Sequence, residues 1–207
     1  VAAMLRERID ALLQRVPEGS RAAEHRGWLA RADVCAAIGF AYGEGRLFDE
    51  AVEWLDRALK SSIGDCPVRA AEQHANFQVR LAAVQWTALR GSGDGSESAA
   101  LQAQRAAIAE RIEAALYELD VINTRAPTRE RLVLLGSACK RLAWVQSSRP
   151  RVEALLNMAQ YYREAFDLGE REDAYAFNNW AVACLLLERI DATYATGDWH
   201  AALAELC

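Results

Sequence analysis

Apolar residues recur at intervals of three and four along almost the whole chain, which is the period of one face of an α-helix. No stretch alternates β-branched and polar residues between turn signals, as a half-buried strand would. The pattern predicts an all-α protein of about nine helices. Because the segments between the helices are short, neighbouring helices are expected to run antiparallel.

Glycine, proline, serine and acidic residues mark where the predicted helices begin and end. The first four predicted helices are residues 2–15, a helix from the Ser20 cap to Tyr42, a helix between the segments GEGR and SSIGDCP, and a helix from Asp65 and Pro67 to the loop 90–98. The next three are residues 98–121, residues 128–146, and a helix from SSRP to residue 168. The last two run from GERED to residue 194 and from TGD onward.

Two consecutive helices within residues 35–58 place small and large residues at fixed separations. Gly39 and Ala51 lack bulk where the helices would cross, so the backbones can approach, and Tyr42 and Leu55 fill the space beside them. The full set is Cys35, Ile38, Gly39, Tyr42, Ala51, Leu55 and Ala58. In order and spacing these residues resemble the tetratricopeptide repeat, which is a helical hairpin.

A second copy of this pattern follows later in the chain. Its residues are Leu132, Leu135, Gly136, Cys139, Met158, Tyr162 and Ala165. Gly136 to Ala165 is 29 positions (165 − 136), where Gly39 to Ala58 is 19 (58 − 39), so this hairpin is longer. The resemblance implies a right-handed α-solenoid of stacked antiparallel hairpins, with residues 1–207 as a single repeat domain. In such arrays the first helix of each hairpin lines the concave wall.

The segments AAEQHANFQVRLA, RERLVLLGSACKRLA and MAQYYREAF add a second resemblance, over residues 65–190. They are similar to a divergent bacterial repeat region that resembles the TRAFs-binding domain of apoptosis signal-regulating kinases. This resemblance implies a regulatory array attached to an effector, such as a caspase-like protease or a kinase. Since the chain begins at Val1 and stops at Cys207 within a helical pattern, we expect a fragment of a longer multidomain protein.

Composition narrows the classes of partner. With 207 residues and 52% hydrophobic content, the chain can bury a continuous core. A formal net charge of -5 gives no field that attracts a polyanion, so neither nucleic acid nor an anionic membrane is expected as a partner. The apolar runs are too short for a membrane span, and Arg6 and Arg8 interrupt any secretory signal.

The cysteines indicate a reducing compartment. There are five, an odd number, and Cys35, Cys139 and Cys184 stand inside apolar helical runs. Such cysteines behave as small buried hydrophobes and not as a disulfide framework. We therefore expect a cytoplasmic protein.

Eight polar residues on the groove-lining helices are candidates for peptide binding. They are Arg69, Gln73, Asn76 and Arg80 on the fourth helix, Lys140 and Arg141 on the sixth, and Asn178 and Asn179 on the eighth. Cations offer charge-assisted hydrogen bonds, and asparagine pairs well with an extended main chain. The alternative interpretation is an ordinary solvated helix face.

The aromatic residues favour packing over base stacking. Six tryptophans occur at nearly one per hairpin: Trp28, Trp54, Trp86, Trp144, Trp180 and Trp199. This spread predicts burial between helices. Tyr161 and Tyr162 are adjacent, so one should pack inward while the other faces outward.

Catalytic signals are weak. No HExxH, paired CxxC, glycine-rich phosphate loop or GxSxG element is present, so we expect no metal and no cofactor. Cys66 could gain reactivity near a helix N-terminus, but His74 lies about two turns away, too far to activate it. We expect no enzymatic activity.

Three functions stay open. The favoured one is a non-catalytic scaffold or regulatory module that binds a protein or peptide, including an effector domain of the same chain. The alternative is a structural or autoinhibitory segment that packs on its own effector domain or self-associates, and a homodimer fits either reading. The third, an enzyme or small-molecule sensor, predicts an enclosed cavity with titratable groups.

Overall fold

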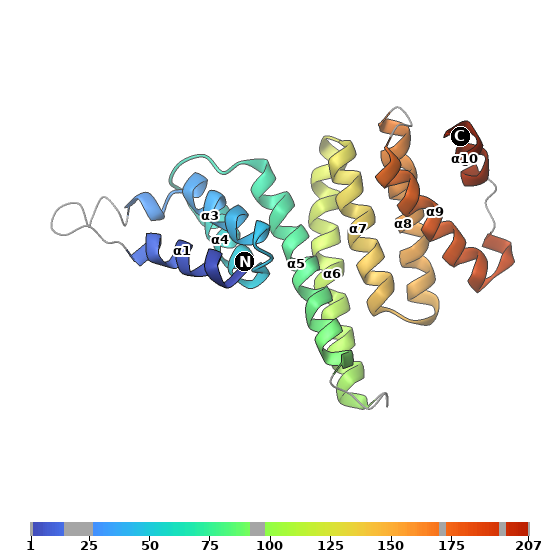
Figure 1. Cartoon of the computed structure of the whole chain (residues 1–207), viewed down its shortest axis with the longest axis horizontal. Coiled ribbons are helices and arrows are strands. Elements are labelled where there is room, and N and C mark those ends of the chain that lie inside the picture. Colours follow the sequence, from blue (N-terminus) through green and yellow to red (C-terminus); the bar gives the residue numbers. More distant parts are fainter. Residues whose placement is uncertain (1, 15–26, 92–97, 170–172, 195–197, 207) are drawn as a thin grey trace. The chain divides into compact units, whose positions relative to one another are not determined.

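The computed structural model describes residues 2–14, 27–91, 98–169, 173–194 and 198–206 (Figure 1). All regular elements in these ranges are helices, and no strand occurs among them. The prediction of an all-α helical repeat is confirmed. The chain divides into two compact units, Val1–Leu81 and Ala82–Cys207, and the single domain expected over 1–207 stays a prediction.

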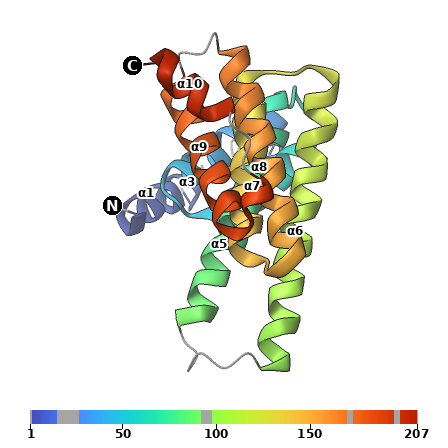
Figure 2. The same ribbon diagram turned by 90° about the vertical axis from the view of Figure 1, so that its right-hand side faces the viewer.

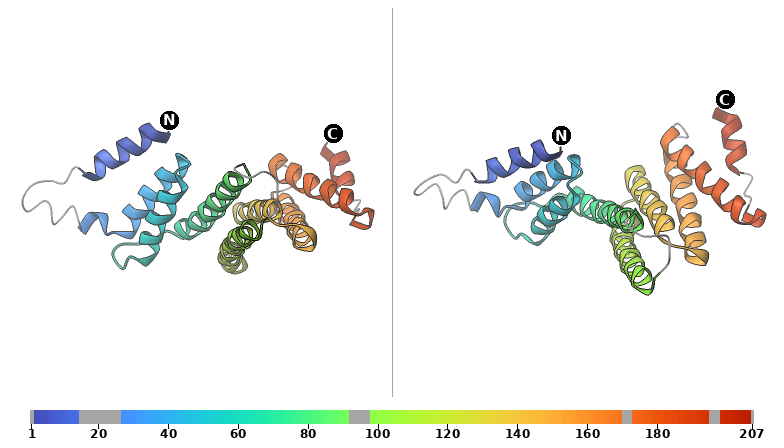
Figure 3. Two further views of the ribbon diagram at one scale, coloured as in Figure 1. Left: turned by 90° about the horizontal axis from the view of Figure 1, so that it is seen from below. Right: turned by 60° about the horizontal axis from the view of Figure 1, so that its bottom comes forward.

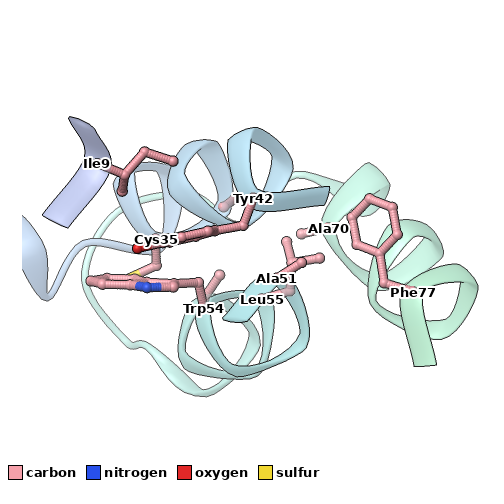
Figure 4. Close-up of a cluster of buried hydrophobic side chains, with 10 residues drawn as sticks. Ile9, Cys35, Tyr42, Ala51, Trp54, Leu55, Ala70 and Phe77 are labelled. Atoms are coloured by element: carbon pink, nitrogen blue, oxygen red, sulfur yellow. The ribbon is translucent and has the colours of Figure 1, made fainter. Parts of the chain in front are cut away.

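The first unit packs helices around one apolar cluster (Figure 4). Its helices are α1 (Ala2–Gln14), α3 (Ala32–Glu44), α4 (Phe48–Lys60) and the first part of α5 (Val68–Gly91). Cys35 and Tyr42 of α3 lie against Trp54 of α4, and Ile9 of α1 and Phe77 of α5 extend the same cluster.

The crossing of α3 and α4 has the geometry that the first repeat motif predicts. A Cβ atom on Gly39 would lie 2.7 Å from Cγ of Leu55 and 3.2 Å from the carbonyl oxygen of Ala51. Ala51 and Leu55 are fully buried. The hairpin interpretation of residues 35–58 is therefore supported by contact geometry as well as by spacing.

The predicted second helix is interrupted. Residues 27–29 are helical, but Arg31 is extended, and α3 begins at Ala32. The amide of Ala32 donates to the carbonyl oxygen of Ile63 at 2.7 Å, and the hydroxyl of Ser61 donates to that of Ala30 at 2.6 Å. These long-range bonds pair backbone groups that a continuous helix would pair internally. The predicted helix is therefore interrupted between Leu29 and Ala32.

The second unit stacks consecutive helices. They are α6 (Ala99–Arg125), α7 (Arg129–Val145), α8 (Ser148–Leu168), α9 (Ala174–Ile190), a 3-10 helix (Ala192–Tyr194) and α10 (Asp198–Leu206). Helix α7 packs between α6 and α8, and α8 packs between α7 and α9 (Figures 2 and 3). Side chains cap the first turns of three of these helices: Ser98, Thr128 and Asp173.

The long α7–α8 hairpin repeats the small-against-large contact. A Cβ on Gly136 would lie 2.8 Å from Cδ2 of Tyr162. All seven residues of the second motif are buried. Phe166 of α8 extends this core toward α9, with its ring centroid 5.5 Å from that of Phe177 and 6.1 Å from that of Trp180.

Several finer predictions need correction. The fifth helix reaches Arg125 instead of 121, and the eighth ends at Ile190 instead of 194. Burial of all six tryptophans is wrong for Trp28 and Trp144, which are 52% and 60% exposed. The Ser20 cap, most of the loop 90–98 and the turns at GERED and TGD lie largely outside the described residues.

Candidate functional site

The Lys140 side chain is held by α9. Its Nζ donates to Oδ1 of Asn179 at 2.9 Å, and Nδ2 of Asn179 donates to the carbonyl oxygen of Tyr175 at 2.9 Å. Asn179 is buried. Two of the predicted binding residues, far apart in sequence, are therefore in direct contact, and the neutral amide leaves the positive charge of Lys140 in place.

Arg141 is fixed by its own helix. Its Nη1 donates to the carbonyl oxygen of Ser137 at 2.9 Å and also to the Ser137 hydroxyl. Trp144 follows Lys140 by four positions and Arg141 by three, so these side chains share one side of α7. The helix thus presents two cations and an aromatic ring together.

A pocket of about 380 Å³ opens over this part of α7. It is lined by Ala83, Thr87, Ser137, Lys140, Arg141, Trp144 and Tyr175, all within the second unit. Two of these side chains are cationic, and none of them is a carboxylate. Because like charges lie close together here, an anionic group is electrostatically favoured in the pocket.

Two aromatic side chains in the lining remain largely open to solvent. Trp144 is 60% exposed and Tyr175 is 55% exposed. The guanidinium of Arg90 lies 5.8 Å from the centroid of the Trp144 ring, within the range of a cation–π contact. Exposed rings beside charged donors can contact apolar and polar parts of one ligand.

Tyr162 lies behind the pocket wall. Its side chain is fully buried, and its hydroxyl has no hydrogen-bond partner of good geometry in the described part of the protein. Its ring packs edge-on against that of Tyr175, with 6.0 Å between centroids. Burial, reinforced by Tyr175, raises the pKa of Tyr162, while Ser137 and Arg141 act in the opposite direction. The hydroxyl therefore keeps its proton at neutral pH and can donate it to a hydrogen bond.

Three of the four predicted residues of α5 are linked by hydrogen bonds in the first unit. Nδ2 of Asn76 donates to Oε1 of Gln73 at 2.9 Å, and Nε of Arg80 donates to Oδ1 of Asn76 at 3.3 Å. The guanidinium of Arg69 lies 5.2 Å from the ring centroid of Phe40. The two hydrogen bonds place Gln73, Asn76 and Arg80 on one helix face, where Asn76 is buried. Joint action with the cations of α7 stays a prediction.

The pocket also shows what sequence reasoning missed. Asn178 is exposed and does not line the pocket, whereas Ser137, Trp144 and Tyr175 do. The first two stand at helical spacing from Lys140 on α7, a signal available in the sequence. Tyr175 is brought in by the packing of α9, which the spacing does not reveal.

Cys66 is the candidate nucleophile that the sequence offers. Burial raises the pKa of the Cys66 thiol, which disfavours a reactive thiolate. In the part of the chain that the structure covers, no group of three or more His, Cys, Asp or Glu side chains is arranged to hold a metal ion. A search of the same residues also finds no helix long and apolar enough to span a membrane.

A comparison with known protein families gives a match over most of the chain. The model of a family described as Tetratricopeptide Repeats-Sensor covers residues 47–187. This range includes α7, α8, most of α9 and every residue that lines the pocket. Comparisons with curated proteins and with solved structures give no match.

Proposed function

Because the chain belongs to the Tetratricopeptide Repeats-Sensor family, we propose that it is a non-catalytic protein-interaction module that binds a peptide segment of its partner. In this role it is the regulatory part of a larger signalling or effector protein. The bound segment comes from a separate protein or from an effector domain of the same chain. Both sources present the same chemistry to the site.

The pocket over α7 is the observation that carries this proposal. Lys140 and Arg141 supply charge-assisted donors, and Trp144 supplies an exposed apolar face beside them. An acidic peptide segment with a neighbouring apolar side chain matches both features. The α5 row of Arg69, Gln73, Asn76 and Arg80, and Asn178 on α9, are proposed as further peptide contacts.

The chemistry of the whole chain favours a protein partner in the cytoplasm. A formal net charge of -5 disfavours nucleic acid and anionic membranes as ligands. The described cysteines Cys35, Cys66, Cys139 and Cys184 are free thiols, which fits a reducing compartment.

A peptide-library experiment tests the proposal. The protein is exposed to an immobilised library of end-capped peptides, and selected peptides are titrated in solution. We compare wild type with the double variant Lys140→Ala, Arg141→Ala. As a control, Arg149→Ala with Arg151→Ala removes the same charge from exposed positions on α8, outside the pocket lining.

Wild type and the α8 control should select the same acidic peptides, and the α7 double variant should lose them. If no peptide binds wild type above background, peptide binding is wrong. If both double variants lose peptide binding equally, binding depends only on net charge. The assignment of the binding site to α7 would then be wrong.

A further inference from the structure

The buried hydroxyl of Tyr162 is the least explained polar group near the pocket. It lies in a fully buried side chain without a hydrogen-bond partner of good geometry in the described protein. A buried donor without a partner costs free energy, so an arrangement that retains one usually has a use for it. The packing role of this residue against Gly136 needs only the ring, which phenylalanine would also supply.

The surroundings of this hydroxyl point to the pocket. The hydroxyl has hydrogen-bond contacts of less favourable geometry with Tyr175 and Ser137 and lies in the field of Arg141, and all three side chains line the pocket. Tyr175 packs edge-on against the Tyr162 ring from the first turn of α9, and over half of its own side chain is exposed. The proposed access route to the hydroxyl is a rotation of the Tyr175 side chain, which leaves the helices in place.

The donors around this point define the ligand chemistry. A neutral hydroxyl, an ammonium and a guanidinium all donate hydrogen bonds, and no lining side chain is a carboxylate. A group that only accepts hydrogen bonds and carries negative charge satisfies all three. Trp144 lies one turn further along α7 from Lys140, so an apolar side chain next to the acidic one would cover its ring.

We infer that the pocket recognises a peptide in which an acidic residue adjoins an aromatic one, with the carboxylate accepting a hydrogen bond from the Tyr162 hydroxyl between Lys140 and Arg141. This inference rests on the proposed peptide-binding function and gives it a specificity. The Tyr162 hydroxyl donates a stronger hydrogen bond to the charged carboxylate than to its neutral amide, and so favours the acid. Trp144 receives the neighbouring aromatic side chain.

Four end-capped peptides with glycine–serine flanks test this recognition. They carry Glu-Phe, Gln-Phe, Glu-Ala or phosphoserine-Phe at the centre, and each is titrated against the protein by fluorescence polarisation. The variant Tyr162→Phe removes only the hydroxyl. The matched control Tyr161→Phe removes a hydroxyl from the next residue of α8, which contacts Asp120 instead of the pocket.

The Glu-Phe peptide should bind wild type and Tyr161→Phe equally, and Tyr162→Phe about tenfold more weakly, as for loss of a hydrogen bond to a charged group. With Gln-Phe the difference between these variants should shrink. Thermal unfolding of ligand-free Tyr162→Phe should occur near or above the wild-type temperature, since no internal hydrogen bond of good geometry is lost.

Equal affinity of Tyr162→Phe and wild type for Glu-Phe would overturn this inference, while leaving the loss expected for the Lys140 and Arg141 double variant intact. Tighter binding of phosphoserine-Phe than of Glu-Phe would overturn the carboxylate assignment. If none of the four peptides binds wild type, the inferred recognition of an acidic residue beside an aromatic one is also wrong. A negative library experiment, by contrast, removes the proposed function itself.

A measurement on wild-type protein keeps the test decisive if Tyr162→Phe does not fold. Tyrosine labelled with carbon-13 at Cζ reports on the hydrogen bond of each hydroxyl. The Tyr162 signal is assigned by elimination, with phenylalanine variants of the other tyrosines. It should shift with Glu-Phe and stay in place with Gln-Phe, and an unchanged signal in both cases would overturn the inference.

Discussion

Gly136 of α7 lies directly on the ring of Tyr162 of α8. A Cβ at position 136 would stand 2.8 Å from Cδ2 and 2.9 Å from Cε2 of that ring, closer than real side chains approach. Tyr162 is fully buried and cannot move aside cheaply. The same tyrosine thus closes the helix crossing and packs its ring against Tyr175 of the pocket lining.

Gly136→Ala should lower the free energy of unfolding by about 1 to 3 kcal/mol, because the added methyl overpacks the crossing. Urea unfolding measures this loss. Gly91→Ala is the control, since a Cβ there meets nothing within 4 Å. The displaced Tyr162 should also weaken binding of the Glu-Phe peptide. Unchanged stability of Gly136→Ala would contradict the close packing of this hairpin.

The corresponding contact in the first repeat allows a double-mutant cycle. Gly39→Ala places a methyl 2.7 Å from Cγ of Leu55 and should destabilise by about 1 to 3 kcal/mol. Leu55→Ala opens a cavity and should cost about 2 to 5 kcal/mol. The double variant should lose less free energy of unfolding than the sum of the two single losses, because the new methyl occupies part of that cavity. Strict additivity in urea unfolding would show that positions 39 and 55 do not meet.

The helical hairpins were predictable because their packing depends on residue size at fixed spacing. Gly39 with Leu55 and Gly136 with Tyr162 can be recognised from the order and the spacing of small and large residues within each helix, although the two hairpins differ in length, and the structure places each pair in contact. The break before α3 was not predictable. Its cause is the capture of backbone groups near Ala32 by the segment around Ile63, a contact between residues 31 positions apart (63 − 32).

The candidate site was predictable in its charges and not in its shape. Lys140 and Arg141 stand out as cations after the glycine of a repeat motif. Trp144 was assigned to the core because tryptophan is usually buried, although it shares the helix face of these cations. Tyr175 and Asn179 lie beside these residues because of how α9 packs relative to α7. The sequence does not reveal this packing, because the length of the chain between the two helices does not fix their alignment.

Asp173 organises the start of α9 and so the position of Tyr175. Its Oδ1 accepts from the amides of Tyr175 at 3.0 Å and Ala176 at 3.1 Å, and its Oδ2 accepts from Nη1 of Arg129 at 3.3 Å. Asp173→Ala should cost about 1 to 2 kcal/mol through loss of the cap. Asp173→Asn should cost less, because the amide oxygen can still cap the helix.

Urea unfolding gives the free energy of unfolding of Asp173→Ala and Asp173→Asn, which can then be compared. Titration with the Glu-Phe peptide shows whether Asp173→Ala also disturbs the pocket. Glu130→Ala is a suitable control, because its exposed carboxylate also reaches Arg129, at 3.4 Å, but caps nothing on α9. Equal stability of Asp173→Ala and wild type would mean that α9 begins without help from this side chain.

The thiol of Cys139 makes the stability of the second unit depend on alkaline pH. Burial among the apolar residues of α7 raises its pKa from the ordinary 9.0 to about 12. Between these values the unfolded chain loses the thiol proton while the folded chain keeps it. The stabilisation is therefore complete below about pH 9 and is lost as the pH rises toward about 12.

The free energy of unfolding should fall across this pH range in wild type and fall less steeply in Cys139→Ala. Other groups contribute in the same direction, since burial also raises the pKa of Tyr161 to about 12, so the slope should decrease without vanishing. Cys66→Ala removes an exposed thiol whose pKa is raised less than that of Cys139, so it should flatten the slope less than Cys139→Ala does. Parallel pH profiles for Cys139→Ala and wild type would show that this thiol ionises as readily in the folded protein as in the unfolded chain.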